Sequence, residues 1–455
     1  TPTESNNYNV ATANALINVV AAFDYGDAPS AYPVLNADDG ARHVVGDLTL
    51  GTTVDLDADG QPSANADADN DDGVALLADA VVDRSSSTTA SFLVTASGES
   101  KLDAWIDFNA DGAWDDVNEK IYDGVSLTAG ENTLSYTVPA GASATGVAAR
   151  FRLSTAGGLS PIGEALDGEV EDYIVTLLDG SNSPNPLIRL VGSDTEISGR
   201  AGQWQVSDGS NVLFAAPHAS VGTLQVQGGL QDDRFSIDLS TSKGLNLDGG
   251  GGFNSVTVDG ANLDVTSGGN LAGVNLHEFD LTSAGETRIT MDASGVLALS
   301  PDNSTVTVRL DASDSIRLTD NPDWRMASPR VTNGEFFLVI DSQASAAQVE
   351  VATTQPWQNP LNPSDIDNGG SVTAGDALLI INELGRRAFS DRTTQELVDP
   401  LNVVSWPGSY YDQNGSNTVT SLDALRVINQ LARDVAEGEG EAIVFVDRNE
   451  DLSRT

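Results

Sequence analysis

The chain has 455 residues and carries 22 basic against 67 acidic side chains, which gives a formal charge of −45. This charge repels nucleic-acid phosphates and anionic membranes, and no apolar run approaches the roughly 20 residues that span a bilayer, so we expect neither nucleic-acid binding nor membrane insertion. The absence of cysteine excludes disulfides and thiolate chemistry, while the length predicts several domains. Because calcium prefers carboxylate oxygens, Ca²⁺ is the expected cofactor.

Residues 1–23 form an N-terminal arm with a polar start and an apolar segment from Val10 to Phe23 that fits a helix or a strand equally well. We expect this arm to be the first strand of the next domain or, as the alternative, a strand exchanged with a neighbouring subunit. The opening residues Thr1–Glu4 lack a basic, apolar leader. They are typical of a secreted chain from which the signal peptide has been removed.

Residues 24–178 contain short alternating strands, such as Ser91–Val94 and Tyr173–Thr176, separated by Gly, Asp and Asn turns. This pattern predicts a β-sandwich. Residues 179–186, rich in Asn, Ser and Pro, cannot continue a sheet and are expected to form a linker.

An acidic loop inside this region has the spacing of a calcium loop. Its oxygen-bearing side chains alternate and are followed by Gly112 at the sixth position; the predicted metal ligands are Asp107, Asn109, Asp111, Asp115 and Glu119. The alternative is a plain acidic turn. A second acidic cluster within residues 55–72 has irregular spacing, and it is either a mobile loop or one that calcium bridges.

Residues 187–351 hold many short pairs of alternating apolar positions, including Phe235–Leu239 and Val306–Leu310, at intervals of roughly 8 to 16 residues. Each such segment has the length of a single strand. The spacing suits the rungs of a small parallel β-solenoid or the strands of a second sandwich, and we favour the solenoid.

An internal duplication lies within residues 352–434. The segment that begins Val372-Thr373-x-x-Asp376-Ala377-Leu378 returns with every matched position 47 residues later. In each copy an Asp-rich loop leads into apolar residues at helical spacing, which predicts a loop followed by a helix, twice.

The spacing of the two loops is that of a calcium-binding loop. Oxygens at positions 1, 3, 5, 7, 9 and 12 of such a loop surround one cation at oxygen–metal distances of about 2.4 Å. In the first loop the ligands are Asp365, Asp367, the Ser371 carbonyl, Thr373 directly or through water, and Asp376. In the second loop they are Asp412, Asn414, Ser416, the Thr418 carbonyl, Thr420 through water, and Asp423. Position 5 of the first loop is Gly369, and Asn417 replaces the usual glycine of the second. Calcium affinity is therefore expected to be weaker than in cytosolic buffers; the alternative is a pair of solvated acidic turns.

The duplicated segment resembles the type I dockerin family, particularly the C-terminal modules of large planctomycete surface proteins, which carry the pattern Asp-x-Asn-x-Asp-Gly-x-Val-Thr-x-x-Asp-Ala-Leu. The resemblance covers residues 352–434. It implies two calcium-binding loop-helix units that dock a cohesin-like partner, with metal roles for Asp365, Asp367, Asp376, Asp412, Asn414 and Asp423.

The run Gly168–Tyr173, which reads Gly-Glu-Val-Glu-Asp-Tyr, resembles the GEVEDY domain, together with Asp24–Pro29, Asp38–His43 and Ala149–Arg152. This resemblance spans nearly all of residues 24–178. Such domains occur in large secreted and surface proteins beside β-repeat and dockerin modules, which implies an extracellular or cell-surface location.

Nothing in the sequence favours an enzyme. The histidines His43, His218 and His277 lie in separate predicted modules and outside hydrolase motifs, although paired carboxylates for glycoside hydrolysis arise by chance among so many acids. The predicted fold is mainly β: a β-sandwich, a β-solenoid-like domain or second sandwich, and a small α-helical dockerin-like domain.

The leading hypothesis is a non-enzymatic, calcium-binding, extracellular structural or adhesive protein whose partners are other surface or matrix proteins. Copies of the chain are a further candidate partner, because the arm and a strand at Glu441–Asp447, in the tail 435–455, suit strand exchange into a fibre. The alternatives are a dockerin-anchored module that binds glycan or protein, and an accessory part of a glycan-degrading enzyme.

Overall fold

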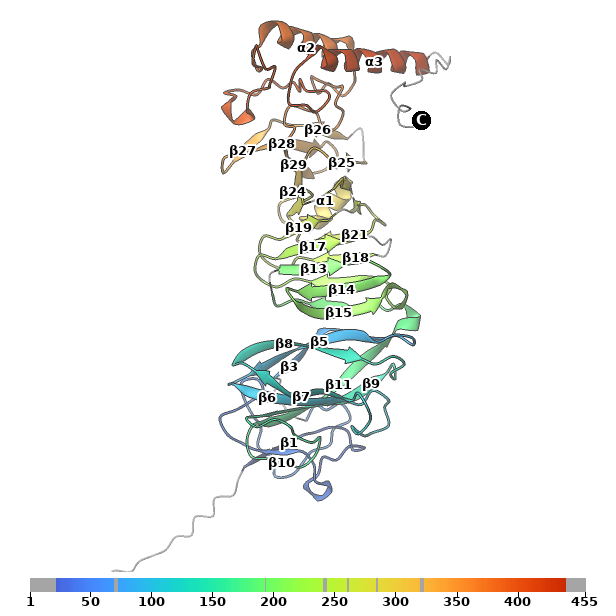
Figure 1. Cartoon of the computed structure of the whole chain (residues 1–455), viewed down its shortest axis with the longest axis vertical. Helices are drawn as coiled ribbons and strands as arrows, with labels where there is room; N and C mark the ends of the chain where they lie inside the picture. Colours follow the sequence, from blue (N-terminus) through green and yellow to red (C-terminus); the bar gives the residue numbers. More distant parts are fainter. Residues whose placement is uncertain are drawn as a thin grey trace, which may run out of the picture. The chain divides into compact units, whose positions relative to one another are not determined.

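The computed structural model describes residues 22–68, 73–192, 194–239, 244–259, 262–283, 285–319 and 323–438. The described chain is mainly β, with its two longest helices near the C-terminal end (Figure 1). The strand predicted at Glu441–Asp447, most of the predicted arm and residues 69–72 of the second acidic cluster lie outside the described residues.

The described residues form two compact units. Unit 1 comprises the residues up to Ala75, Phe92–Leu134 and Gly146–Thr176, and unit 2 comprises Leu76–Ser91, Ser135–Thr145 and the residues from Leu177 onward. Several strands of the predicted sandwich thus contribute to both units.

Two sheets build the sandwich. One is ordered β4-β11-β9-β6-β7 and consists of Ala80–Val82 (β4), Glu169–Asp179 (β11), Gly146–Ser154 (β9), Ser100–Ile106 (β6) and Lys120–Leu127 (β7). The other is the stretch β3-β5-β8 of a larger sheet that continues into later strands, and it consists of Val74–Ala78 (β3), Thr88–Ala96 (β5) and Gly130–Val138 (β8). A small separate sheet joins Phe23–Tyr25 (β1), Arg42–Val44 (β2) and Glu164–Ala165 (β10), and the 3-10 helix η1 (Asn36–Asp38) precedes β2.

Strand β9 is buried on both faces. On one face Phe151 meets Phe92 of β5 edge to face, with 5.1 Å between the ring centroids. On the other, Arg150 is fully buried and donates two hydrogen bonds of 2.7 Å to Asp172 of β11. A buried charge needs such a partner, which explains the Asp that precedes Tyr173 in the run from which the family resemblance was drawn.

Parallel ladders form a β-solenoid in unit 2, so the solenoid and not a second sandwich follows residue 187. The first ladder consists of Leu187–Arg189 (β12), Leu224–Gln227 (β16), Leu245–Asp248 (β18) and Leu271–Val274 (β21). The second consists of Asp194–Ser198 (β13), Arg234–Asp238 (β17), Ser255–Val258 (β19), Glu278–Asp280 (β22), Thr305–Leu310 (β24) and Gln348–Thr353 (β29). The third consists of Leu263–Asp264 (β20), Arg288–Met291 (β23) and Ser315–Leu318 (β25).

The solenoid core is a stack of apolar side chains in register along the ladders. In the second ladder Phe235 pairs with Val256, Val256 with Phe279, Phe279 with Val308, and Val308 with Val351. All five are buried, and in β17, β19 and β24 they alternate with more exposed residues, whereas in β29 Glu350 and Ala352 are buried as well. The strand alternation in the sequence therefore matches a two-residue period with one buried face.

Antiparallel strands and short helices complete the solenoid. The strands are Gln203–Asp208 (β14), Asn211–Pro217 (β15), Trp324–Met326 (β26), Arg330–Thr332 (β27) and Glu335–Ser342 (β28). The helices are α1 (Ala293–Leu299) and the 3-10 turns η2 (Gly180–Asn182) and η3 (His218–Ser220).

The duplicated segment forms two helices that pack on each other, α2 (Ala374–Arg386) and α3 (Ser421–Gly438). Between them lies an irregular segment that contains η4 (Pro400–Asn402). In this segment Trp406 stacks on Trp357 with 4.4 Å between ring centroids, and Tyr410 belongs to the hydrophobic core of the solenoid. The helical module and the end of the solenoid therefore share buried side chains within unit 2.

Candidate metal-binding loops

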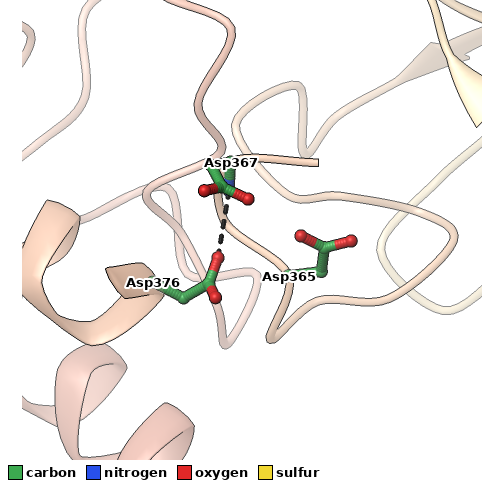
Figure 2. Close-up of side chains that lie close together, drawn as sticks. All are labelled: Asp365, Asp367 and Asp376. Atoms are coloured by element: carbon green, nitrogen blue, oxygen red, sulfur yellow. Dashed lines mark hydrogen bonds between the residues drawn. The ribbon is translucent and has the colours of Figure 1, made fainter. Parts of the chain in front are cut away.

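The first loop (residues 365–376) gathers three carboxylates. Asp365 and Asp376 are buried and Asp367 is exposed, and each contributes an oxygen that lies within 4.8 Å of the others (Figure 2). The Asp367 N–H donates to Asp376 Oδ1 at 3.1 Å. All three were predicted ligands, and the fold brings them to one point although Asp376 comes from helix α2.

Backbone N–H groups hold the Asp365 side chain in place. Gly369 and Gly370 donate to its two oxygens at 2.9 and 2.8 Å. The Gly369 N–H also donates to Asp367 Oδ1 at 2.9 Å. These hydrogen bonds hold the carboxylates in place without a cation. Less conformational entropy is therefore lost when a cation binds to the loop.

The start of α2 fixes the third carboxylate. Thr373 is the N-cap, and its hydroxyl oxygen accepts from the Gly375 N–H at 3.1 Å. Asp376, at the third helical position, accepts from the Thr373 N–H at 2.7 Å, which completes a capping box. Thr373 was predicted as a ligand, directly or through water; in this structure its hydroxyl also donates to Asp376, at 3.0 Å.

The second loop (residues 412–423) repeats this network. Asp412 accepts from the N–H groups of Ser416 and Asn417 at 2.9 and 2.6 Å, and Asn414 accepts from Ser416 at 3.0 Å. Asp423 accepts from the Thr420 N–H and hydroxyl at 2.9 and 3.0 Å. Every one of these hydrogen bonds has its counterpart 47 residues earlier.

The remaining predicted ligands offer hydroxyl or carbonyl oxygens rather than carboxylates. Ser371 lies exposed on the first loop, and Thr418 is the equivalent residue of the second. The Ser416 and Thr418 hydroxyls are 2.8 Å apart. The first loop therefore has three carboxylates and no side chain at position 5, whereas the second has two carboxylates with an amide at position 3 and a hydroxyl at position 5.

Burial makes the loops electrostatically unfavourable on their own. It raises the pKa of Asp365 above the ordinary carboxyl value, and the charges of Asp376 and Asp367 raise it further. Burial likewise raises the pKa of Asp412, with Asp423 adding to the effect. Clustered, buried, oxygen-only donors fit a hard divalent cation, whose charge offsets this repulsion.

Both loops are hydrogen-bonded to the C-terminal end of the solenoid. The Asn368 side chain donates to the Met326 carbonyl at 3.0 Å. In the second loop, the carbonyl of Gly415 accepts from the Gln355 side chain at 2.7 Å, and Asn417 donates to Thr354 at 2.8 Å. These contacts were not predictable, because nothing in the local sequence pattern indicates which backbone carbonyls lie nearby.

The helices expose a matched pair of apolar patches. Leu378 and Ile381 of α2 are 55% and 47% exposed, and their counterparts in α3, Leu425 and Ile428, are 50% and 45% exposed. The buried faces are instead formed by residues such as Ala377 and Ile380, or Ala424 and Val427. Apolar residues thus lie on two faces of each helix. The sequence pattern does not distinguish these faces, whereas the structure shows which one packs in the core and which one is exposed.

The third predicted loop, here called the sandwich loop (residues 107–119), connects β6 to β7. Asp107 and Glu119 are buried at its two ends, whereas Asn109, Asp111 and Asp115 lie on the surface between them. Asp116, which was not predicted as a ligand, accepts from the Asn109 side chain at 2.6 Å. In the described part of the chain, only the Asp365 trio brings three acidic side chains within 4.8 Å of one another.

Two acidic loops, each leading into a helix and closed by a carboxylate in the first turn of that helix, place this segment in the dockerin class of module. Residues 363–432 match the family model of the Dockerin type I domain, and residues 101–176 match that of the GEVED domain. The suspected arrangement of modules is thereby confirmed. Comparison with curated proteins and with solved structures gave no match.

These two families are non-catalytic modules. Among the described residues, no helix is long and apolar enough to cross a membrane. The histidines have unrelated surroundings: His43 is buried beside Arg152, His218 lies against Trp204, and His277 stacks on Phe253.

Proposed function

We propose that this chain is a calcium-dependent docking protein, in which the dockerin module binds a cohesin-like partner and the β-domains form a non-catalytic scaffold. The observation that carries the proposal is the duplicated loop-helix geometry, with the same hydrogen bonds in both copies and a matched exposed apolar patch on each helix. Calcium is the proposed ligand of both loops, held by the residues predicted from the sequence.

Calcium and docking are connected through the closing carboxylates. Asp376 belongs to the metal loop and to the capping box of α2, so a cation that holds this side chain also fixes the start of the helix. Asp423 occupies the same position at the start of α3. Without the cation, repulsion between the carboxylates lowers the stability of the loops and of the helix starts that they hold.

The docking surface is apolar and duplicated. Exposed Leu and Ile side chains at matching positions of α2 and α3 suit burial against an apolar surface of a cohesin-like partner. Because the two patches are equivalent, either one offers the partner a similar surface.

Binding to a panel of purified cohesin modules, measured by surface plasmon resonance in calcium and in chelator, tests this proposal. We expect calcium-dependent binding by the full chain. Replacement of one patch (L378E/I381E or L425E/I428E) leaves the other available, whereas the fourfold variant weakens binding on the order of a hundredfold or more. Leu230→Glu, at an 85% exposed leucine of the solenoid, is the matched control. Binding to no cohesin, or binding that survives both chelation and the fourfold variant, contradicts the proposal.

An extracellular structural or adhesive role is compatible with docking. The high negative charge, the calcium loops and the stacked solenoid suit a scaffold that displays a docking module in calcium-rich surroundings. Fibre formation by strand exchange depends on segments outside the described residues. Light scattering and negative-stain microscopy in calcium and after chelation test it: calcium-dependent fibres support self-assembly, and a monomer under both conditions contradicts it.

We also propose that the chain has no catalytic activity of its own. The support is the pair of non-catalytic family matches and the scattered histidines. Turnover by the purified chain on a polysaccharide panel contradicts this proposal and favours the accessory-enzyme alternative.

A further inference from the structure

We propose that the sandwich unit holds a calcium site of its own, separate from the dockerin module, in which Asp107, Asn109, Asp111 and Glu119 supply oxygens and Asp116 lies at the rim. This goes beyond the docking function, because the sandwich loop lies in unit 1 and joins two strands. No helix follows it.

The sandwich loop adopts the backbone of the dockerin loops. Asp107, at position 1, accepts from the N–H groups at positions 5 and 6, Asp111 and Gly112, at 3.3 and 2.9 Å. The Asn109 side-chain oxygen, at position 3, accepts from position 5 at 3.0 Å. Positions 4 and 6, Ala110 and Gly112, have the positive φ angles of 61° and 89° that both dockerin loops also show at these positions. The loop spacing predicted from the sequence therefore has the matching three-dimensional form.

An independent observation points to a cation: the Glu119 side chain is 2% exposed, and its Oε1 has no hydrogen-bond partner among the described residues. Its other oxygen accepts from the Asp116 N–H at 3.0 Å. A buried carboxylate oxygen without a donor is strongly unfavourable, and nearby acidic side chains cannot donate to it when ionised. A divalent cation supplies the missing partner.

Glu119 faces the other acids of the loop. Burial raises the pKa of its carboxyl above the ordinary value, and the charges of Asp107, Asp116 and Asp111 raise it further. A bound cation converts that repulsion into attraction.

The loop closes one residue later than the dockerin loops. They place the closing Asp at position 12, where this loop has Asn118 in a left-handed conformation with φ of 76°. That turn brings the next residue, Glu119, to the closing position, and its longer side chain reaches back into the loop. The backbone also orients Asp116 rather than the predicted Asp115 towards Asn109.

The site is connected to the hydrophobic core beneath it. Asp107 accepts from the Tyr32 hydroxyl at 2.5 Å, and the Tyr32 ring stacks on Trp114 at 4.3 Å. Trp114 in turn lies under the Arg150 guanidinium, 4.5 Å from the ring centroid. Trp114 belongs to the loop itself. Terbium bound at the proposed calcium site is therefore expected to accept excitation energy from this tryptophan, so that terbium luminescence reports cation binding.

The test uses the full chain with the closing carboxylates of both dockerin loops neutralised (D376N/D423N). Calcium titration by calorimetry is expected to show binding that remains in this background and disappears on adding Glu119→Gln. Glu131→Gln, at an exposed acidic residue of β8 in the same unit, is the matched control and is expected to leave binding unchanged. Tryptophan-sensitised terbium emission should follow the same order. Absent binding in the background chain, or binding that Glu119→Gln leaves intact, overturns the proposal.

Thermal unfolding distinguishes a lost ligand from a lost fold. In chelator, Glu119→Gln should melt at the same temperature as the background chain or higher, because a buried, unpaired charge has been removed. The increase in melting temperature that calcium gives the background chain should vanish in this variant. A lower melting temperature in chelator with the calcium increase retained also overturns the proposal. None of these outcomes bears on cohesin docking, since the dockerin loops are disabled throughout.

Discussion

The two dockerin loops share one geometry but not one set of side chains. Position 3 is Asp367 in the first loop and Asn414 in the second, and position 5 is Gly369 in the first and Ser416 in the second. The N–H groups of positions 5, 6 and 9 nevertheless donate to the carboxylates at positions 1 and 12 in both loops. The loop backbone is thus specified by its two end carboxylates and its turn residues, which leaves the middle positions free to tune the affinity for the cation.

The turn residues themselves are exchanged between the copies. Positions 4 and 6 have positive φ in both loops, and they are Asn368 and Gly370 in the first but Gly415 and Asn417 in the second. Glycine and asparagine are the residues that adopt this conformation at least cost. The Asn417 that departs from the family pattern therefore preserves the turn.

The largest effect is expected from removing a closing carboxylate. Asp376→Ala deprives the first loop of a ligand and leaves the N–H groups of Ile366 and Thr373 without their acceptor. We expect a loss of about 3 kcal/mol in the free energy of unfolding, measured by urea denaturation in calcium. Asp423→Ala should behave alike, and Asp434→Ala, at an exposed position of α3, is the control. Closing-residue variants as stable as this control would show that the carboxylates do not hold the loops.

An intermediate effect is expected from exchanging the position 3 side chains. Asp367→Asn removes a carboxylate from the first loop and Asn414→Asp adds one to the second, while both side chains keep an oxygen that accepts from position 5. Calcium affinity should fall in the first variant and rise in the second, each on the order of tenfold. Calorimetry of each variant, with the other loop disabled at its closing carboxylate, measures this. Unchanged affinities would mean that position 3 does not reach the cation.

Most of the dockerin module could be predicted from the sequence, because each copy of the repeat supports the interpretation of the other. The exact offset identified both loops and both helices, and alternation identified the solenoid strands from Phe235 onward. What the sequence could not predict depends on backbone direction: the loop orients Asp116 rather than Asp115 towards Asn109, and burial separates Ile380 from its exposed neighbour Ile381. Contacts between segments distant in the sequence, such as Asn417 with Thr354, leave no local pattern.

The smallest effect is expected at the exchanged turn residue. Asn417→Ala places a side chain that disfavours left-handed backbone at φ of 56° and also removes the hydrogen bond to the Thr354 carbonyl. We expect a destabilisation of about 1–2 kcal/mol, measured by urea denaturation in chelator so that the cation does not contribute. Asn417→Gly loses the same hydrogen bond but keeps the backbone conformation, so the difference between the two variants isolates the strain. If both variants lose the same stability, the hydrogen bond to Thr354, and not the turn, explains the asparagine at this position. If only Asn417→Ala is destabilised, asparagine and glycine are interchangeable here because both adopt the left-handed turn.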